Sequence, residues 1–132
     1  MNPPTLVDAL ARYDALVEVG IGRRTDVAEA LAERGADVTA TDVYDHEIPA
    51  AVAFVRDDVT DPDPTVYEGS DAVYALNLPP ELHRPAREAA LDAGADFLFT
   101  TLGGDPPAVP VERRTVATGT LFVADSDPQK RN

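Results

Sequence analysis

Two glycines separated by a single residue follow directly on a short apolar run near the N-terminus. The run, Ala15–Val19, has the length and composition of a buried strand and leads into Gly20-Ile21-Gly22. A helix is expected next, because capping residues and an amphipathic stretch follow. Glycines in such a turn let a ligand approach the backbone, and they direct amide N–H groups toward a negative group. Residues 15–42 are therefore predicted to form a βαβ unit whose ligand-facing loop is residues 18–22.

Apolar runs and helical stretches alternate along the rest of the chain. Further strands are expected at residues 36–41, 51–55, 72–76 and 95–101, helices around residues 6–13, between 25 and 35 and at 81–93, and a hairpin at 111–116 and 121–124. This alternation predicts an α/β fold with a mainly parallel sheet, and the length predicts one domain over residues 1–132. Ligands bind beyond the carboxyl ends of the strands in such sheets, so the residues just after each strand are the candidates.

The chain is strongly acidic, with 24 Asp and Glu residues against 11 Lys and Arg residues and a formal net charge of −13. Such a surface repels nucleic acids and anionic lipids, so neither is an expected partner. The acids are spread along the chain and Lys130 is the only lysine, a balance that looks like that of a halophilic archaeal protein. Without a cysteine, a signal peptide or an apolar run that could span a bilayer, we expect a cytoplasmic protein.

Asp42 ends the second expected strand, 22 positions after Gly20. An acidic residue at about this distance accepts hydrogen bonds from ribose hydroxyls in nucleotide-binding βαβ units. A dinucleotide site would have a third glycine where Thr25 stands, which disfavours an NAD-type ligand. Glu18, two residues before Gly20, suits a ligand that carries a cationic amine. The combination favours a small-molecule adenosyl ligand with an amine and no phosphate, such as S-adenosylmethionine.

The run from Val17 to Gly22 resembles the first motif of class I S-adenosylmethionine-dependent methyltransferases. This resemblance implies that the first loop binds the methionine end of the cofactor, the second loop the ribose and the third loop the adenine. The residues concerned are Glu18, Gly20, Gly22, Asp42, Asp57 and Asp58. The whole chain, including the double-proline segment at residues 71–82, further resembles the small archaeal uncharacterised protein family 0146. Membership implies a Rossmann-like three-layer sandwich with a mainly parallel sheet and a C-terminal hairpin.

Two departures from the methyltransferase pattern bear on activity. Arg23 follows Gly22, where methyltransferases usually continue to another glycine. Leu78 interrupts the Asn-Pro-Pro-aromatic motif of amino-methylating enzymes, and Glu81 stands in place of the aromatic residue. Asn77 is the best-placed candidate to position a methyl acceptor. A small methyltransferase, a non-catalytic ligand-sensing or interaction module and an NAD-type nucleotide-binding domain stay open, in that order.

Two further sets of polar residues are expected to be structural. Asp42, Asp45, His46 and Glu47 match the spacing of no defined metal-binding loop, so no metal site is predicted. His83 has the chemistry of a general base, but its place near a helix start predicts a surface histidine.

Overall fold

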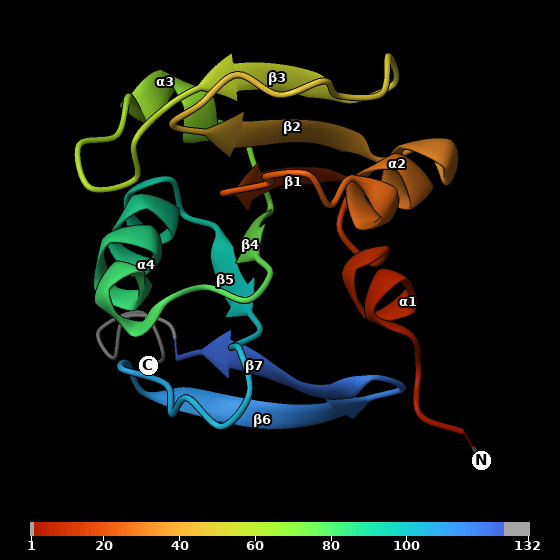
Figure 1. Ribbon diagram of the computed structural model, residues 1–132, viewed down its shortest axis with the longest axis vertical. Coiled ribbons are helices and arrows are strands. Elements are labelled where there is room, and N and C mark those ends of the chain that lie inside the picture. The colour runs from red at the N-terminus through yellow and green to blue at the C-terminus, as the bar shows by residue number, and fades with distance from the viewer. Residues whose placement is uncertain (1, 126–132) are drawn as a thin grey trace.

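The computed structural model describes residues 2–125, in which one seven-stranded sheet lies between two pairs of helices (Figure 1). The helices are α1 (Leu6–Leu10), α2 (Asp26–Glu33), α3 (Pro64–Tyr67) and α4 (His83–Asp92), and a 3-10 turn, η1 (Pro80–Leu82), precedes α4. The strands are β1 (Ala15–Val19), β2 (Asp37–Asp42), β3 (Ala53–Arg56), β4 (Ala72–Ala75), β5 (Asp96–Phe99), β6 (Val111–Val116) and β7 (Gly119–Ala124). None of these helices is long and apolar enough to cross a membrane.

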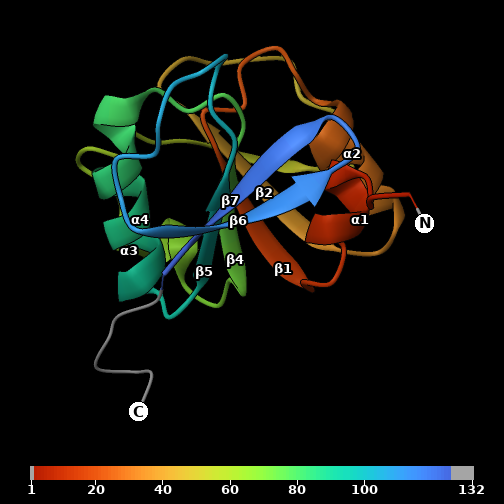
Figure 2. The same ribbon diagram turned by 90° about the horizontal axis from the view of Figure 1, so that it is seen from below.

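The sheet has the strand order β3-β2-β1-β4-β5-β7-β6. The first five strands in this order are parallel, whereas β7 runs antiparallel to both β5 and β6. Figure 1 shows α1 and α2 on one face and α3 and α4 on the other, and Figure 2 shows the same layers from below. The fold is therefore the expected α/β three-layer sandwich with a C-terminal hairpin.

Two hydrophobic clusters, one on each face of the sheet, bury the central strands. All four residues of β4 are buried, as expected for a parallel strand covered by helices on both faces. On one face Leu10 and Leu31 pack with Leu16 and Leu98, and on the other Phe97 and its neighbours pack against α4. This packing holds β1 and β4 at the centre of the sheet, which makes the loops that follow them well-supported positions for a site.

Three element boundaries differ from those predicted from the sequence. Strand β3 begins at Ala53 rather than at residue 51, because a turn closed by the Val52 amide and the Pro49 carbonyl takes up the preceding residues. Strand β5 begins at Asp96, since the Ala95 amide still caps the end of α4. The helix expected at residues 81–93 opens instead with the 3-10 turn η1, after two prolines that cannot donate backbone hydrogen bonds.

The N-terminal segment is tied to the tip of the β6–β7 hairpin. The Ala117 amide donates to the Pro4 carbonyl at 2.8 Å, and Figure 2 shows α1 beside this end of the hairpin. Thr5 and Asp8 form a reciprocal capping box that starts α1. The short helix is thereby fixed against the sheet although it has only five residues.

Replacement of Leu10 tests this packing, because its side chain is fully buried between α1 and the sheet. We expect Leu10→Ala to lower the free energy of unfolding by about 2 to 4 kcal/mol. Urea denaturation in molar KCl measures the effect. The matched control is Leu102→Ala, at a side chain that is 67% exposed, for which we expect a change below about 0.5 kcal/mol. Equal losses in the two variants would contradict the docking of α1.

Candidate functional site

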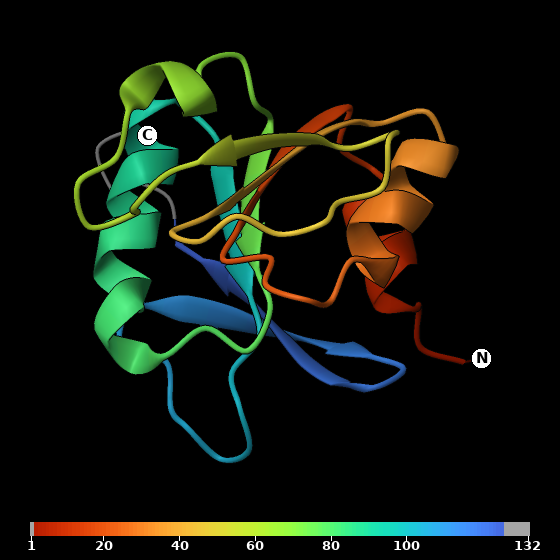
Figure 3. The ribbon, with the colours of Figure 1, turned by 45° about the horizontal axis from the view of Figure 1, so that its top comes forward.

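The turn after β1 adopts the left-handed backbone conformation that its glycines permit. Gly20 has φ +69° and Gly22 has φ +56°, values that a residue with a Cβ adopts only with strain. The Ile21 amide between them donates to the Thr41 carbonyl at 3.0 Å. The turn is thus fastened to the end of β2, and Figure 3 shows it running from β1 to α2 at that edge of the sheet.

Asp42, the last residue of β2, faces this turn. Its Oδ2 accepts a 2.9 Å hydrogen bond from the Gly22 amide, and its Oδ1 accepts one of 3.1 Å from the Tyr44 amide. The His46 ring nitrogen Nε2 lies 3.4 Å from Oδ1, and only 12% of the Asp42 side chain is exposed. Each carboxylate oxygen can accept a second hydrogen bond, so the group can still receive hydroxyl donors from a ligand.

Glu18 is a buried acid in the middle of the sheet, with 1% of its surface exposed. Its Oε1 accepts a 2.6 Å hydrogen bond from the Tyr74 hydroxyl of the neighbouring strand β4. Burial raises the pKa of the Glu18 carboxyl to about 7, although the Tyr74 hydrogen bond and the nearby Arg24 guanidinium act in the opposite direction. Burial and the Glu18 charge also raise the pKa of Tyr74, so the phenol stays a donor.

The two acids after β3 lie next to Asp42 but are already engaged within their own loop. The Asp57 amide donates to the Asp42 carbonyl at 3.0 Å, which places the two residues side by side. The Asp57 carboxylate accepts from the Asp63 amide at 3.0 Å and from the Tyr67 hydroxyl at 3.2 Å. Asp58 is exposed and accepts from the amide and hydroxyl of Thr60. The ends of β1, β2 and β3 therefore bring the predicted binding residues into one row.

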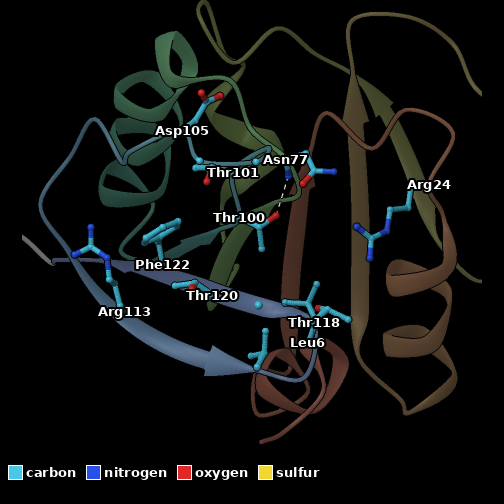
Figure 4. Close-up of a pocket in the computed structure, with 14 residues that line it drawn as sticks. Leu6, Arg24, Asn77, Thr100, Thr101, Asp105, Arg113, Thr118, Thr120 and Phe122 are labelled. Carbon is cyan, nitrogen blue, oxygen red and sulfur yellow. Dashed lines mark hydrogen bonds between the residues drawn. The ribbon is translucent and has the colours of Figure 1, made fainter.

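Asn77 lies apart from that row, at the largest described cavity, which has a volume of about 580 Å³ (Figure 4). Its backbone has φ +53°, and its amide donates to Thr100 Oγ1 at 2.8 Å. The cavity is lined by residues that follow β4 and β5, by the start of α2 and by the β6–β7 hairpin. They are Leu6, Arg24, Asn77, Thr100, Thr101, Gly103, Gly104, Asp105, Arg113, Val116, Thr118, Gly119, Thr120 and Phe122.

His83 is fully buried, so the prediction of a surface histidine was wrong. Its Nε2 donates to the Leu78 carbonyl at 2.9 Å, because its Nδ1 accepts the Ala108 amide at 3.0 Å. The ring also packs against Phe99, with 4.5 Å between ring centres. His83 therefore links the double-proline segment to the loop before β6, and both of its nitrogens are occupied by backbone groups.

Several residues at this edge of the sheet were not predicted from the sequence. Tyr74 was assigned only to a strand, and Arg24, Thr100 and Arg113 gave no motif, since they meet only after the chain has folded. The rule that sites lie just after parallel strands would have pointed to Thr100. Within residues 2–125, no group of three His, Cys, Asp or Glu side chains is placed to hold a metal ion.

Comparison with known sequences decides the family. Residues 1–127 match the profile described as "Uncharacterised protein family (UPF0146)". The chain belongs to the UPF0146 family. A UPF0146 protein from the archaeon Halobacterium salinarum is 60% identical over 124 residues, which cover 93% of this chain and 96% of that relative. The resemblance identified from the sequence is confirmed, and this relative comes from a halophile.

Solved structures similar to this UPF0146 protein include methyltransferases. A TehB-like SAM-dependent methyltransferase from Corynebacterium glutamicum matches with a TM-score of 0.60 and 16% identity, over 89% of this chain and 83% of that one. The N-terminal domain of EvdMO1 with SAH bound matches with a TM-score of 0.55 and 13% identity, over 89% and 64% of the two chains. Two other matching chains are longer, and the UPF0146 chain spans 47% and 44% of them. These likenesses establish the Rossmann-like, methyltransferase-type fold.

Replacement of Glu18 by Gln tests the buried acid, because Gln keeps the acceptor for Tyr74 without the charge. The folded protein holds the Glu18 proton up to a pH of about 7, whereas an unfolded chain loses it near 4.5. The charged form therefore lowers the free energy of unfolding as the pH rises from about 4.5 to 7. We expect Glu18→Gln to be more stable than the natural protein by about 2 to 3 kcal/mol above pH 7, with the difference vanishing toward pH 4.5.

Urea denaturation at a series of pH values measures this difference. Glu33→Gln, at an exposed acid near the end of α2, is the control and should show a difference that hardly changes with pH. A gain from Glu18→Gln that does not change between pH 4.5 and 8 would contradict the raised pKa.

Proposed function

We propose that this UPF0146 protein binds S-adenosylmethionine, or a closely related adenosyl ligand, at the carboxyl ends of β1, β2 and β3. The observation that carries the proposal is the contact between the glycine turn and Asp42, with the buried Glu18 beside them. The turn offers backbone N–H groups, Asp42 offers acceptors for hydroxyl groups, and Glu18 offers a negative charge for an amine. An adenosyl amino acid carries the complementary groups in the same order.

The proposed contacts follow the row of residues along the edge of the sheet. Glu18 would bind or orient the amine, with Gly20 and Gly22 at the methionine end of the ligand. Asp42 would accept hydrogen bonds from the ribose hydroxyls, and Asp57 or Asp58 would face the adenine amino group. A cationic amine near Glu18 favours the ionised carboxylate, so binding should be accompanied by release of the Glu18 proton near pH 7.

The activity that fits such a ligand is methyl transfer to a small molecule. The acceptor atom attacks the methyl carbon, a new bond forms to that carbon, and the bond from carbon to the sulfonium breaks to leave a neutral thioether. This reaction depends mainly on alignment of the acceptor with the methyl group. Asn77, at the cavity beyond β4, is the residue that we propose to position the acceptor.

A second candidate, a non-catalytic ligand-sensing module, is favoured by the structure of the double-proline segment. Leu78 is buried, with 4% of its surface exposed, and its carbonyl accepts the hydrogen bond from His83. The segment is therefore anchored in the core at the position where amino-methylating enzymes have a residue of their substrate motif. Ligand binding without any methylated product would support this candidate.

Isothermal titration calorimetry with S-adenosylmethionine, S-adenosylhomocysteine and NAD, in molar KCl, tests the proposal. We expect the two adenosyl amino acids to bind and NAD not to bind. Asp42→Ala should weaken the binding of S-adenosylhomocysteine by about 1 to 3 kcal/mol, the usual cost of losing hydrogen bonds to a charged group. Asp45→Ala is the matched control, because Asp45 is an exposed acid in the same loop.

The outcomes separate the candidate functions. Binding of NAD alone would overturn the proposal in favour of an NAD-type domain. An unchanged affinity in Asp42→Ala, or the same loss in Asp45→Ala, would remove Asp42 from the site. Incubation with labelled S-adenosylmethionine and an archaeal extract then distinguishes a methyltransferase, which gives a labelled small molecule, from a sensor, which gives none.

A further inference from the structure

The cavity at Asn77 lies beside the proposed adenosyl site but is built from different residues. Arg24 connects the two places, because it lines the cavity and also acts on the pKa of the Glu18 carboxyl. The other walls come from the segments after β4 and β5 and from the β6–β7 hairpin. A molecule in this cavity would therefore sit next to the methionine end of an adenosyl ligand.

The charge of the cavity is opposite to that of the chain. Its charged lining residues are Arg24, Arg113 and Asp105, two positive and one negative, in a protein with a formal net charge of −13. Figure 4 shows Arg24 and Arg113 on opposite sides of the cavity and the Asp105 carboxylate turned away from Thr100. A local positive site of this kind attracts small anions, while the acidic remainder of the surface repels large polyanions.

The two arginines are available to a ligand. Within residues 2–125, Arg113 makes no ion pair, and its guanidinium carbon lies 5.5 Å from the centre of the Phe122 ring. Arg24 pairs with Asp26 at 3.3 Å, but both side chains are largely exposed, so the pair is weak and can exchange for another anion. Guanidinium groups bind carboxylates and phosphates through paired hydrogen bonds.

The remaining lining residues add hydroxyl groups and an apolar wall. Thr100 Oγ1 accepts the Asn77 amide, which leaves its own O–H to donate to a ligand. Phe122 and Leu6 supply apolar surface. A volume of about 580 Å³ is in the range of pockets for small organic molecules.

We propose that this cavity binds a small organic anion, a carboxylate or phosphate attached to an apolar or aromatic group, with Arg24 and Arg113 as its charge partners. Resting on the proposed function, this anion is the methyl acceptor. Its acidic group would be held by the arginines, and its acceptor atom would lie near Asn77, toward the adenosyl ligand. The proposal names a ligand class, and it can be tested without any adenosyl ligand.

The test uses four probes of similar size that differ in charge: phenyl phosphate, benzoate, benzyl alcohol and benzylamine. Each is titrated into the full-length protein, without an adenosyl ligand, at the lowest KCl concentration that preserves the circular dichroism spectrum. Amide chemical shifts in two-dimensional NMR report binding. We expect phenyl phosphate or benzoate to shift the amides of residues 77, 100 and 120, and the neutral and cationic probes to bind at least tenfold more weakly. The stronger of the two anions identifies the acidic group.

Variants assign the site to the arginines. Arg24→Gln and Arg113→Gln should each weaken the binding of the preferred anion about tenfold, the usual effect of losing a charge-assisted hydrogen bond. Arg114→Gln is the matched control, because Arg114 lies on the same strand, does not line the cavity and is near Glu112. It should change the affinity less than twofold.

Three results would overturn the proposal: benzylamine binding as well as the anions, no probe binding, or Arg114→Gln weakening the anion as much as the other two variants. These results are distinguishable from failure of the proposed function. Binding of phenyl phosphate without binding of S-adenosylhomocysteine would keep the anion site and remove the methyl acceptor role. Binding of S-adenosylhomocysteine with no anionic probe bound would do the reverse.

Discussion

The hydrogen bonds between the end of β1 and the end of β2 fix the geometry on which the candidate site depends. The Ile21 amide binds the Thr41 carbonyl, and the Gly22 amide binds the Asp42 carboxylate. Without these bonds the glycine turn would have no defined orientation, because residues without a Cβ restrict the backbone little. The bonds also set the start of α2, and with it the position of Arg24 at the neighbouring cavity.

The buried pair of Glu18 and Tyr74 connects stability with ligand choice. A carboxylate this deeply buried has few partners, and within residues 2–125 its one hydrogen bond comes from the Tyr74 hydroxyl. The protein therefore carries an energetic penalty at neutral pH that a more apolar residue would avoid. A positive group bound nearby would offset this penalty. Such a trade between stability and binding is common where a fold carries a site.

The sequence predicted the fold well because its signals are local. Apolar strands, the glycine turn and the helix stops each act over a few residues, and together they gave the parallel sheet and the hairpin. The row of Glu18, Gly22 and Asp42 also followed from strand ends. The partners of these residues could not be predicted, because Tyr74 reaches Glu18 only through the pairing of β1 with β4. The burial of His83 likewise depends on Ala108, which is 25 residues away in the chain.

The attachment of the N-terminal segment to the hairpin tip has a practical consequence. Pro4 is bonded to Ala117, and Leu6, two residues further on, lines the large cavity. An affinity tag joined directly to the first residues would therefore sit at the rim of the cavity and compete with small molecules for it. Ligand screens with this protein should use a tag that is removed before measurement, or one placed at the other end of the chain.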